Sequence, residues 1–173
     1  MTIHQDGYIA ISFDIKKGQA PGMQVRLLGE YDGRKDYLVV FKKGDEAFAG
    51  LHEFAEKYEV KSASFTAIGA ANKIILGWIS PDKKRYKNIA PEGQVEIGSM
   101  MGNIALYNGK SVVHAHAVVT ASDGTTRSGH IFELYVWPTL EVMVTVYPGE
   151  IIKTLDSEVG IPLLAPCNGN SSC

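Results

Sequence analysis

The chain has 173 residues, the length of one ordinary domain, and 45% of them are hydrophobic and 21% charged. This composition is that of a folded globular protein with a core of its own. The net charge of −2 gives no general attraction for nucleic acid, so DNA contact would need a local basic patch or a partner subunit. No apolar run approaches the ~20 residues that span a bilayer, and no signal-peptide pattern begins the chain. We therefore expect a cytoplasmic protein that does not enter a membrane.

Strands are predicted on either side of the first glycine-containing loop. Residues 8–15 alternate between apolar and polar side chains, as a half-buried strand does. Two further strands are predicted at residues 23–28 and 37–41, with Asp32-Gly33 in the turn between them.

One helix is predicted directly after these strands. Asp45 is the expected N-cap, and Glu46 lies in the first turn, where the helix dipole favours a carboxylate. Apolar residues then recur at helical spacing, so the helix should cover one face of a sheet. The apolar stripe consists of Phe48, Leu51, Phe54, Ala55 and Tyr58.

The rest of the chain is predicted to form strands joined by short turns. Asn108-Gly109 is the strongest hairpin signal, and the strand before it should bend at Gly98 or Gly102. The predicted strands are residues 62–68, 74–80, 85–87, 94–107, 112–120, 126–135 and 140–147.

Short connections between successive strands predict antiparallel pairing. We therefore expect an α+β fold, with antiparallel twisted sheets closing towards a barrel and one main helix packed on a sheet face. Residues 1–150 should form a single domain, and residues 151–173 a C-terminal arm with a disordered end.

Two features allow either a functional or a structural interpretation. Cys167 and Cys173 are either a redox or metal-binding pair or two unpaired thiols, and a reducing cytosol favours the second interpretation. His52, at the edge of the helical stripe, is either a ligand or a partly buried surface histidine, and we favour the second.

Three of the five histidines lie between positions 114 and 130. His114 and His116 share one face of a predicted strand, because strand side chains alternate. The next turn is Ser122-Asp-Gly124, which matches a three-residue hairpin loop closed by a left-handed glycine. In that register His116 lies directly opposite His130.

The same register pairs Ala121 with Thr125 and places His114 opposite Phe132. Cβ atoms of directly opposed residues are about 5 Å apart, so His114, His116 and His130 could meet at one ion. A two-residue Asp-Gly turn would instead put His130 on the other face and break the cluster.

Three converging neutral imidazoles are a ligand set for a divalent metal ion, with zinc the best match. Three protein ligands leave one coordination position open for water or a small molecule, which is typical of catalytic and ligand-binding sites. The alternative interpretation is a polar strand face whose histidines hold no ion.

The order of motifs along residues 23–148 resembles the stand-alone prokaryotic PPC (plants-and-prokaryotes-conserved) domain, which follows AT-hook motifs in plant proteins. The resemblance rests on short motifs at residues 67–70, 75–78, 84–86, 96–104, 114–116, 123–124, 128–130 and 139–142. Ser128 stands where the family often has glycine.

The resemblance implies one helix packed on antiparallel sheets, a homotrimer, and a metal site at His114, His116 and His130. Members are commonly labelled DNA-binding, but this chain lacks the Arg-Gly-Arg-Pro core of an AT-hook. Its one basic cluster is Lys83, Lys84, Arg85 and Lys87, which we interpret as a solvated hairpin tip rather than a phosphate contact.

The fold that the resemblance implies is also similar to that of acetolactate decarboxylase, a zinc enzyme, which suggests a lyase-like reaction on a small carbonyl or carboxylate compound. In such a site the metal would act as a Lewis acid. We identify no catalytic residue. Glu96 and Asn103 are candidates to contact the metal ligands, and Glu133 is a weaker one because its side chain falls on the opposite strand face from His130.

Three functions follow from these observations. The first is a trimeric metal-binding PPC protein that binds a small ligand or serves as an assembly module. The second is a metal-dependent enzyme, and the third is a DNA-binding regulator. An enzyme would need a convergent Arg, Lys or carboxylate near the metal, whereas a DNA binder would need a continuous basic stripe.

Overall fold

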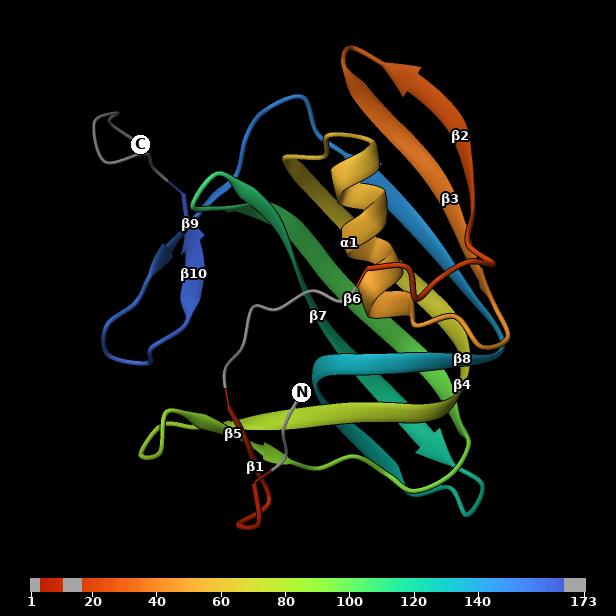
Figure 1. Ribbon diagram of the computed structural model, residues 1–173. Helices are drawn as coiled ribbons and strands as arrows, with labels where there is room; N and C mark the ends of the chain where they lie inside the picture. The colour runs from red at the N-terminus through yellow and green to blue at the C-terminus, as the bar shows by residue number, and fades with distance from the viewer. Residues whose placement is uncertain (1–3, 11–16, 167–173) are drawn as a thin grey trace.

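The computed structural model of the protein describes residues 4–10 and 17–166. It consists mainly of β-strands, against which the helix α1 (Ala47–Lys57) packs (Figure 1). The strands are β1 (Tyr8–Ile9), β2 (Gln24–Tyr31), β3 (Arg34–Lys42), β4 (Ser62–Ser80), β5 (Arg85–Asn88), β6 (Val95–Tyr107), β7 (Lys110–Ala121), β8 (Thr126–Val146), β9 (Ile152–Leu155) and β10 (Pro162–Ala165).

Four of the strands close a ring of backbone hydrogen bonds. β4 pairs with β6, β6 with β7, β7 with β8, and β8 returns to β4, all antiparallel. β3 and β2 extend the sheet from β8, and β5 and β1 extend it from β4. The predicted α+β class, with twisted antiparallel sheets closing towards a barrel, is confirmed, although the ring is not an even barrel.

The ring is uneven because β4 and β8 are long, bent strands. The second half of β4 and the middle of β8 run across Figure 1 at a steep angle to β6 and β7. The prediction of two strands at residues 62–68 and 74–80 is wrong, since β4 continues through both. It bends at Gly69, which has φ 153°. A Cβ at Gly69 would meet the backbone carbonyl of Thr139, so this close approach requires glycine.

β8 likewise continues through two predicted strands, residues 126–135 and 140–147. Its pairing with β4 shifts between Val136 and Leu140, and Pro138 lies in this irregular stretch. Proline has no N–H to donate to a ladder, so an irregularity is where a strand can accommodate it.

The helix begins one residue later than predicted. Glu46, not Asp45, is the N-cap, and its carboxylate accepts hydrogen bonds from the backbone N–H groups of Phe48 and Ala49 at 3.1 and 2.7 Å. The same carboxylate accepts from the N–H of Leu134 on β8 at 2.8 Å. One buried side chain therefore caps α1 and ties it to the sheet.

Asp45 is not the cap because its carboxylate is used by the preceding loop. It accepts from the backbone N–H groups of Gly22 and Lys42 at 2.8 and 2.9 Å. A carboxylate that turns back to these two donors cannot also reach the first turn of the helix.

The apolar stripe of the helix faces the sheet as predicted. Leu51, Phe54 and Ala55 are fully buried against β7 and β8, whereas Phe48 and Tyr58 are partly exposed. Burying a side chain such as Leu51 or Phe54 stabilises the fold by about 1.5–3 kcal/mol. The inner face of the ring and this stripe form one hydrophobic core.

The two-residue hairpins form where they were predicted. Asp32-Gly33 connects β2 to β3, and Asn108-Gly109 connects β6 to β7, all four residues with positive φ. β6 shifts its pairing at Gly98, one of its two predicted bends.

The ends of the chain are described only in part. β1 covers the start of the strand predicted at residues 8–15, and residues 11–16 lie outside the described part. β9 and β10 form a hairpin at the start of the predicted arm, while Cys167, Cys173 and the predicted disordered end lie outside the described residues. Within the described residues, no helix is long and apolar enough to cross a membrane.

Candidate metal centre

Alternation along β7 places two histidines on one face of the strand. His114 and His116 lie on the face away from the core, whereas Val113, Ala115 and Ala117 are buried in the core on the other side. The three small apolar residues fix the orientation of β7, because turning the strand over would expose them and bury both imidazoles.

The turn after β7 sets the position of the third histidine. The N–H of Ala121 donates to the carbonyl of Thr125 at 2.9 Å, and Gly124 closes the loop with φ 82°. His116 is consequently paired with His130 on β8. The predicted three-residue loop is confirmed, and the alternative two-residue turn is excluded.

The ladder between β7 and β8 ends at this pair. Beyond His130, β8 pairs with β4, where Ile131 lies opposite Leu76. Phe132 therefore belongs to the part of β8 that follows β4, and its predicted pairing with His114 is not part of the ladder.

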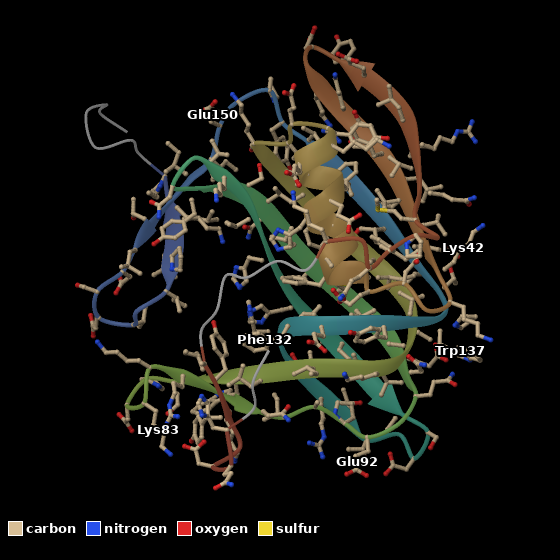
Figure 2. The ribbon with its side chains drawn as sticks, viewed as in Figure 1. Lys42, Lys83, Glu92, Phe132, Trp137 and Glu150 are labelled. Atoms are coloured by element: carbon tan, nitrogen blue, oxygen red, sulfur yellow. The ribbon has the colours of Figure 1, made fainter. Side chains whose placement is uncertain are left out.

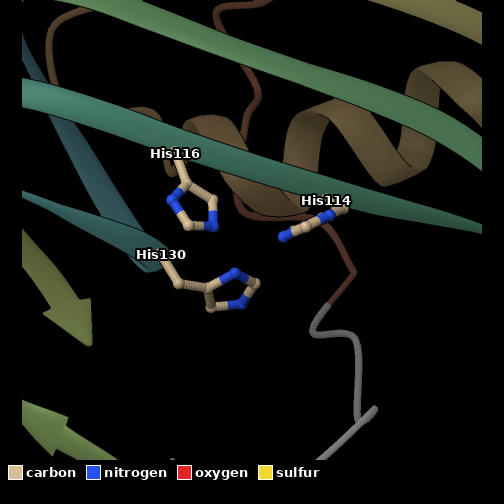
Figure 3. Close-up of side chains that lie close together, drawn as sticks. All are labelled: His114, His116 and His130. Carbon is tan, nitrogen blue, oxygen red and sulfur yellow. The ribbon is translucent and has the colours of Figure 1, made fainter. Parts of the chain in front are cut away.

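The three imidazoles converge on one point (Figure 3). One nitrogen from each of His114, His116 and His130 can be chosen so that all lie within 4.8 Å of one another. Ring centroids are 5.1 Å apart for His114 with either neighbour and 5.6 Å apart for His116 and His130. A tetrahedral zinc ion holds its nitrogen ligands about 3.3 Å apart, so small side-chain rotations would complete the site.

The environment keeps these histidines neutral. Burial lowers the pKa of His114 to about 4, helped by the positive charges of Lys153 and His116. The pKa of His130 is lowered to about 3, mainly by burial and further by the charges of the other two histidines and of Lys153. Burial also lowers the pKa of His116. Neutral imidazole is the form that binds metal, so the donors are ready at neutral pH.

Aromatic side chains hold His130 in place. Tyr86 on β5 stacks on its ring at 4.9 Å between centroids, and Phe132 meets the ring edge-on at 4.8 Å. The buried Nδ1 of His130 has no hydrogen-bond partner within the described part of the chain. An unpartnered buried nitrogen is costly, and a metal ion or a ligand would satisfy it.

The two residues predicted to contact the metal ligands lie in different places. Asn103 on β6 is paired with His114, and its buried Oδ1 has no partner among the described residues. Glu96 is exposed and is paired with Thr120, four residues along β7 from His116, a distance of about 13 Å for a strand. The structure thus brings Asn103 to the histidines but not Glu96.

Two weaker candidates lie outside the cluster. Glu133 forms an ion pair with Lys73 at 3.3 Å, so its carboxylate is directed elsewhere. His52 lies partly buried on α1 against the ring of Phe48, and is not one of the three converging histidines.

Lys153 belongs to the surroundings of the site, and sequence analysis missed it. It lies on β9 and is only 6% exposed, which is unusual for lysine. Burial lowers its pKa, and its charge lowers the pKa of His114 and His130. No local sequence pattern indicates this effect, because Lys153 lies more than twenty residues from the histidines in the sequence.

The basic cluster lies at the turn between β4 and β5, where Figure 2 labels Lys83, and continues onto β5, where Tyr86 between Arg85 and Lys87 contacts the rings of His130 and Phe132. The Lys83 ammonium lies over the ring of Tyr8 at 4.0 Å, and Arg85 pairs with Asp6 at 3.1 Å. Lys84 donates to a backbone carbonyl between β9 and β10 at 3.0 Å. These cations thus have partners within the chain.

Solved structures share this fold over most of their length. A candidate DNA-binding protein from Ralstonia eutropha is 32% identical, with a TM-score of 0.70, over 75% of this chain and 90% of its own. A PPC protein from Pyrococcus horikoshii is 25% identical, with a TM-score of 0.71, over 84% and 96%. A metal-containing protein from Archaeoglobus fulgidus is 28% identical, with a TM-score of 0.71, over 79% and 96%.

A search of curated proteins finds no match. The sequence profile of the Plants and Prokaryotes Conserved domain, abbreviated PCC or PPC, matches residues 29–148. These residues include β3 to β8, α1 and all three clustered histidines. The chain therefore belongs to the plants-and-prokaryotes-conserved domain family.

Proposed function

We propose that this PPC-domain protein binds a divalent metal ion, zinc, through His114, His116 and His130. The convergence of three neutral imidazoles within 4.8 Å carries the proposal. Three nitrogen ligands suit zinc, and the described residues around them include no fourth histidine, cysteine or carboxylate of the same group. The metal-containing relative from Archaeoglobus fulgidus supports the assignment.

The residues around the ion suit the binding of a small ligand. A bound ion would supply a Lewis-acid position open to one further oxygen or nitrogen ligand. Tyr86 and Phe132 hold His130 and exclude water from one side, while Asn103 offers a buried acceptor beside His114.

The protein also presents a surface suited to self-association. Ile68, Met101, Val118 and Met143 project from the outer face of the sheet, with 41–62% of each residue exposed. Met101 on β6 is paired with Thr66 on β4 and with His116 on β7. Thr66 is in turn paired with Met143 on β8, so the apolar side chains on this face form an exposed patch. Such patches mark interaction surfaces. We propose that this patch is the contact between the subunits of a homotrimer.

DNA binding, suggested by the name of the relative from Ralstonia eutropha, has less support. It would require a free basic surface, and Lys83, Lys84 and Arg85 already have partners within the chain.

Elemental analysis of the protein, purified without chelators, tests the metal assignment. We expect about one divalent ion per chain, and dialysis against a strong chelator should remove it while the far-ultraviolet circular dichroism remains that of a folded β protein. A metal content near zero, together with no uptake of added Zn²⁺ in calorimetry, would overturn the proposal.

A further inference from the structure

The N-terminal segment, residues 4–10, docks on β5 at one end of the sheet (Figure 1). Its strand β1 pairs with β5, so that Ile9 lies opposite Tyr86. The N–H of Asn88 donates to the carbonyl of Gly7 at 2.9 Å and extends this contact. A pairing of so few residues is marginal on its own, so side chains must contribute to the docking of the segment.

Charged side chains fasten the segment from the outside. Arg85 forms an ion pair with Asp6 at 3.1 Å. The Lys83 ammonium lies 4.0 Å from the centre of the Tyr8 ring, and the Arg85 guanidinium lies 5.3 Å from it. Partly exposed contacts of this kind are individually weak, so the docking depends chiefly on what the segment buries.

The side chain that the segment buries is Ile9. It is fully buried in a small hydrophobic cluster with Ile75 and Tyr86, separate from the main core, and Phe132 packs against this cluster. Tyr86 in turn stacks on the ring of His130. Ile9 therefore joins the N-terminal segment to the aromatic ring that contacts a proposed metal ligand.

The rings beside His130 are closely packed because position 77 has no side chain. Gly77 is paired with His130 across β4 and β8. A Cβ at Gly77 would lie 2.6 Å from the ring of Phe132 and 2.9 Å from the Cβ of Tyr86. The two aromatic rings also meet edge-on, with 5.0 Å between their centroids. Side chains packed this closely transmit strain, so a displacement of Tyr86 reaches His130.

We propose that the N-terminal segment is a positioning element of the histidine site, and that Ile9 acts on metal binding through Tyr86 and His130. The inference rests on the proposed metal site. With the segment docked, Ile9 packs Tyr86 onto the imidazole and limits its rotation to the orientation that meets His114 and His116. With the segment detached, Tyr86 loses its packing on one side and the metal is held more weakly. Because coupling between two sites is reciprocal, a bound ion must stabilise the docked segment by the same factor.

The Zn²⁺ affinity of the full chain, measured by competition with a chromophoric chelator, tests the first half of this coupling. Ile9→Ala and Ile9→Asn remove the apolar packing on Tyr86. Each should weaken Zn²⁺ binding by about fivefold or more, the lower end of the coupling found between distinct sites. Ile9→Val keeps most of the packing and should remain close to the wild type.

Ile97→Ala is the matched control. Ile97 is only 2% exposed, but it lies in the main core, outside the cluster that contains Tyr86. The variant should lower the denaturant midpoint and leave the Zn²⁺ affinity of the folded protein unchanged. A general loss of stability therefore cannot imitate the expected result.

Hydrogen exchange, followed by mass spectrometry, tests the second half of the coupling. Saturating Zn²⁺ should slow the exchange of the backbone amides of residues 4–10 in the wild type, because the ion favours the docked segment. In Ile9→Asn the same amides should exchange rapidly with and without the metal.

Each contrary outcome has its own meaning. If the wild type takes up no Zn²⁺, the proposed metal site falls, and this inference falls with it. If the wild type binds Zn²⁺ and Ile9→Asn exchanges rapidly at residues 4–10 with unchanged Zn²⁺ affinity, the metal site stands and the coupling is refuted. Slow exchange in Ile9→Asn would show that Ile9 does not fasten the segment, which also refutes it. So would an equal fall in affinity in Ile97→Ala.

Discussion

His116 on β7 and His130 on β8 are directly paired across the ladder, with their ring centroids 5.6 Å apart. The pairing depends on the three-residue loop that ends at Gly124. Because side chains alternate along a strand, a register shift of one residue would turn His130 to the other face of the sheet. The length of one surface turn therefore determines whether the three imidazoles meet.

Replacing His116 by alanine should remove most of the metal without unfolding the protein. His116 is exposed, so its loss leaves the core intact, but it deprives the ion of one of three ligands. We expect metal affinity to fall at least about 100-fold, because losing a direct ligand should cost no less than losing a residue that only hydrogen-bonds to a ligand. Competition with a chromophoric chelator measures the affinity.

His4→Ala is the matched control, because His4 is also exposed and lies outside the cluster. It should leave metal affinity and content unchanged. Equal metal content in His116→Ala and wild type would refute the assignment of His116 as a ligand.

The stability of the metal-free protein should decline from about pH 6.5 towards pH 4, partly through His52. Burial lowers the pKa of His52 to about 4, while a hydrogen bond with the backbone of Ser111 opposes the shift. Between pH 6.5 and 4 the unfolded chain binds a proton at His52 that the folded chain does not. One such proton reduces the free energy of unfolding by about 1.4 kcal/mol for each unit that the pH falls.

Urea denaturation of wild type and His52→Leu at pH 7, 6 and 5, with chelator present, isolates this contribution. Both curves contain the titration of the other histidines, so only their difference matters. The wild type should lose stability more steeply than the variant as the pH falls. Parallel curves would show that His52 titrates alike in the folded and unfolded chains.

Glu46→Ala should destabilise the fold by about 2–4 kcal/mol, since it removes a helix cap and leaves a buried N–H on β8 without an acceptor. Glu56→Ala is the control, because Glu56 forms an exposed ion pair with Lys17 and should contribute less than about 1 kcal/mol. Denaturant midpoints measure both effects. Similar losses in the two variants would mean that Glu46 does not join α1 to the sheet.

Met101→Glu should dissociate the proposed trimer, because it introduces a charge into the exposed apolar patch. Light scattering after size-exclusion chromatography would then give the mass of three chains for the wild type and of one chain for the variant. Tyr31→Glu, at the exposed end of β2, should leave the assembly intact. A trimer in Met101→Glu would place the contact elsewhere, and a monomeric wild type would contradict self-association.

The parts of the fold that could be predicted are those governed by local rules. The Asn108-Gly109 hairpin, the three-residue loop at Gly124 and the apolar stripe on α1 each follow from a few neighbouring residues. The facing of His116 and His130 follows from the loop, because loop length fixes register in a hairpin. The facing of these two histidines could therefore be predicted without knowledge of the rest of the sheet.

What sequence analysis missed depends on contacts between distant segments. Asp45 is the better N-cap by local preference. Glu46 takes the position because the carboxylate of Asp45 accepts a hydrogen bond from the backbone of Gly22 instead. The need for glycine at position 69 follows from the close approach of Thr139 on β8. Lys153 resembles any solvated lysine until β9 is docked beside β6.

The peptide that carries His130 is held from both sides, since His130 is paired with His116 on β7 and with Gly77 on β4. A ligand on a doubly paired strand has little freedom left to lose when an ion arrives. The conformational entropy of assembling the site has thus already been lost when the domain folds, unlike in a zinc finger, which folds only around its metal. A metal ion bound at the proposed site could therefore leave, return or be exchanged for another without the domain unfolding.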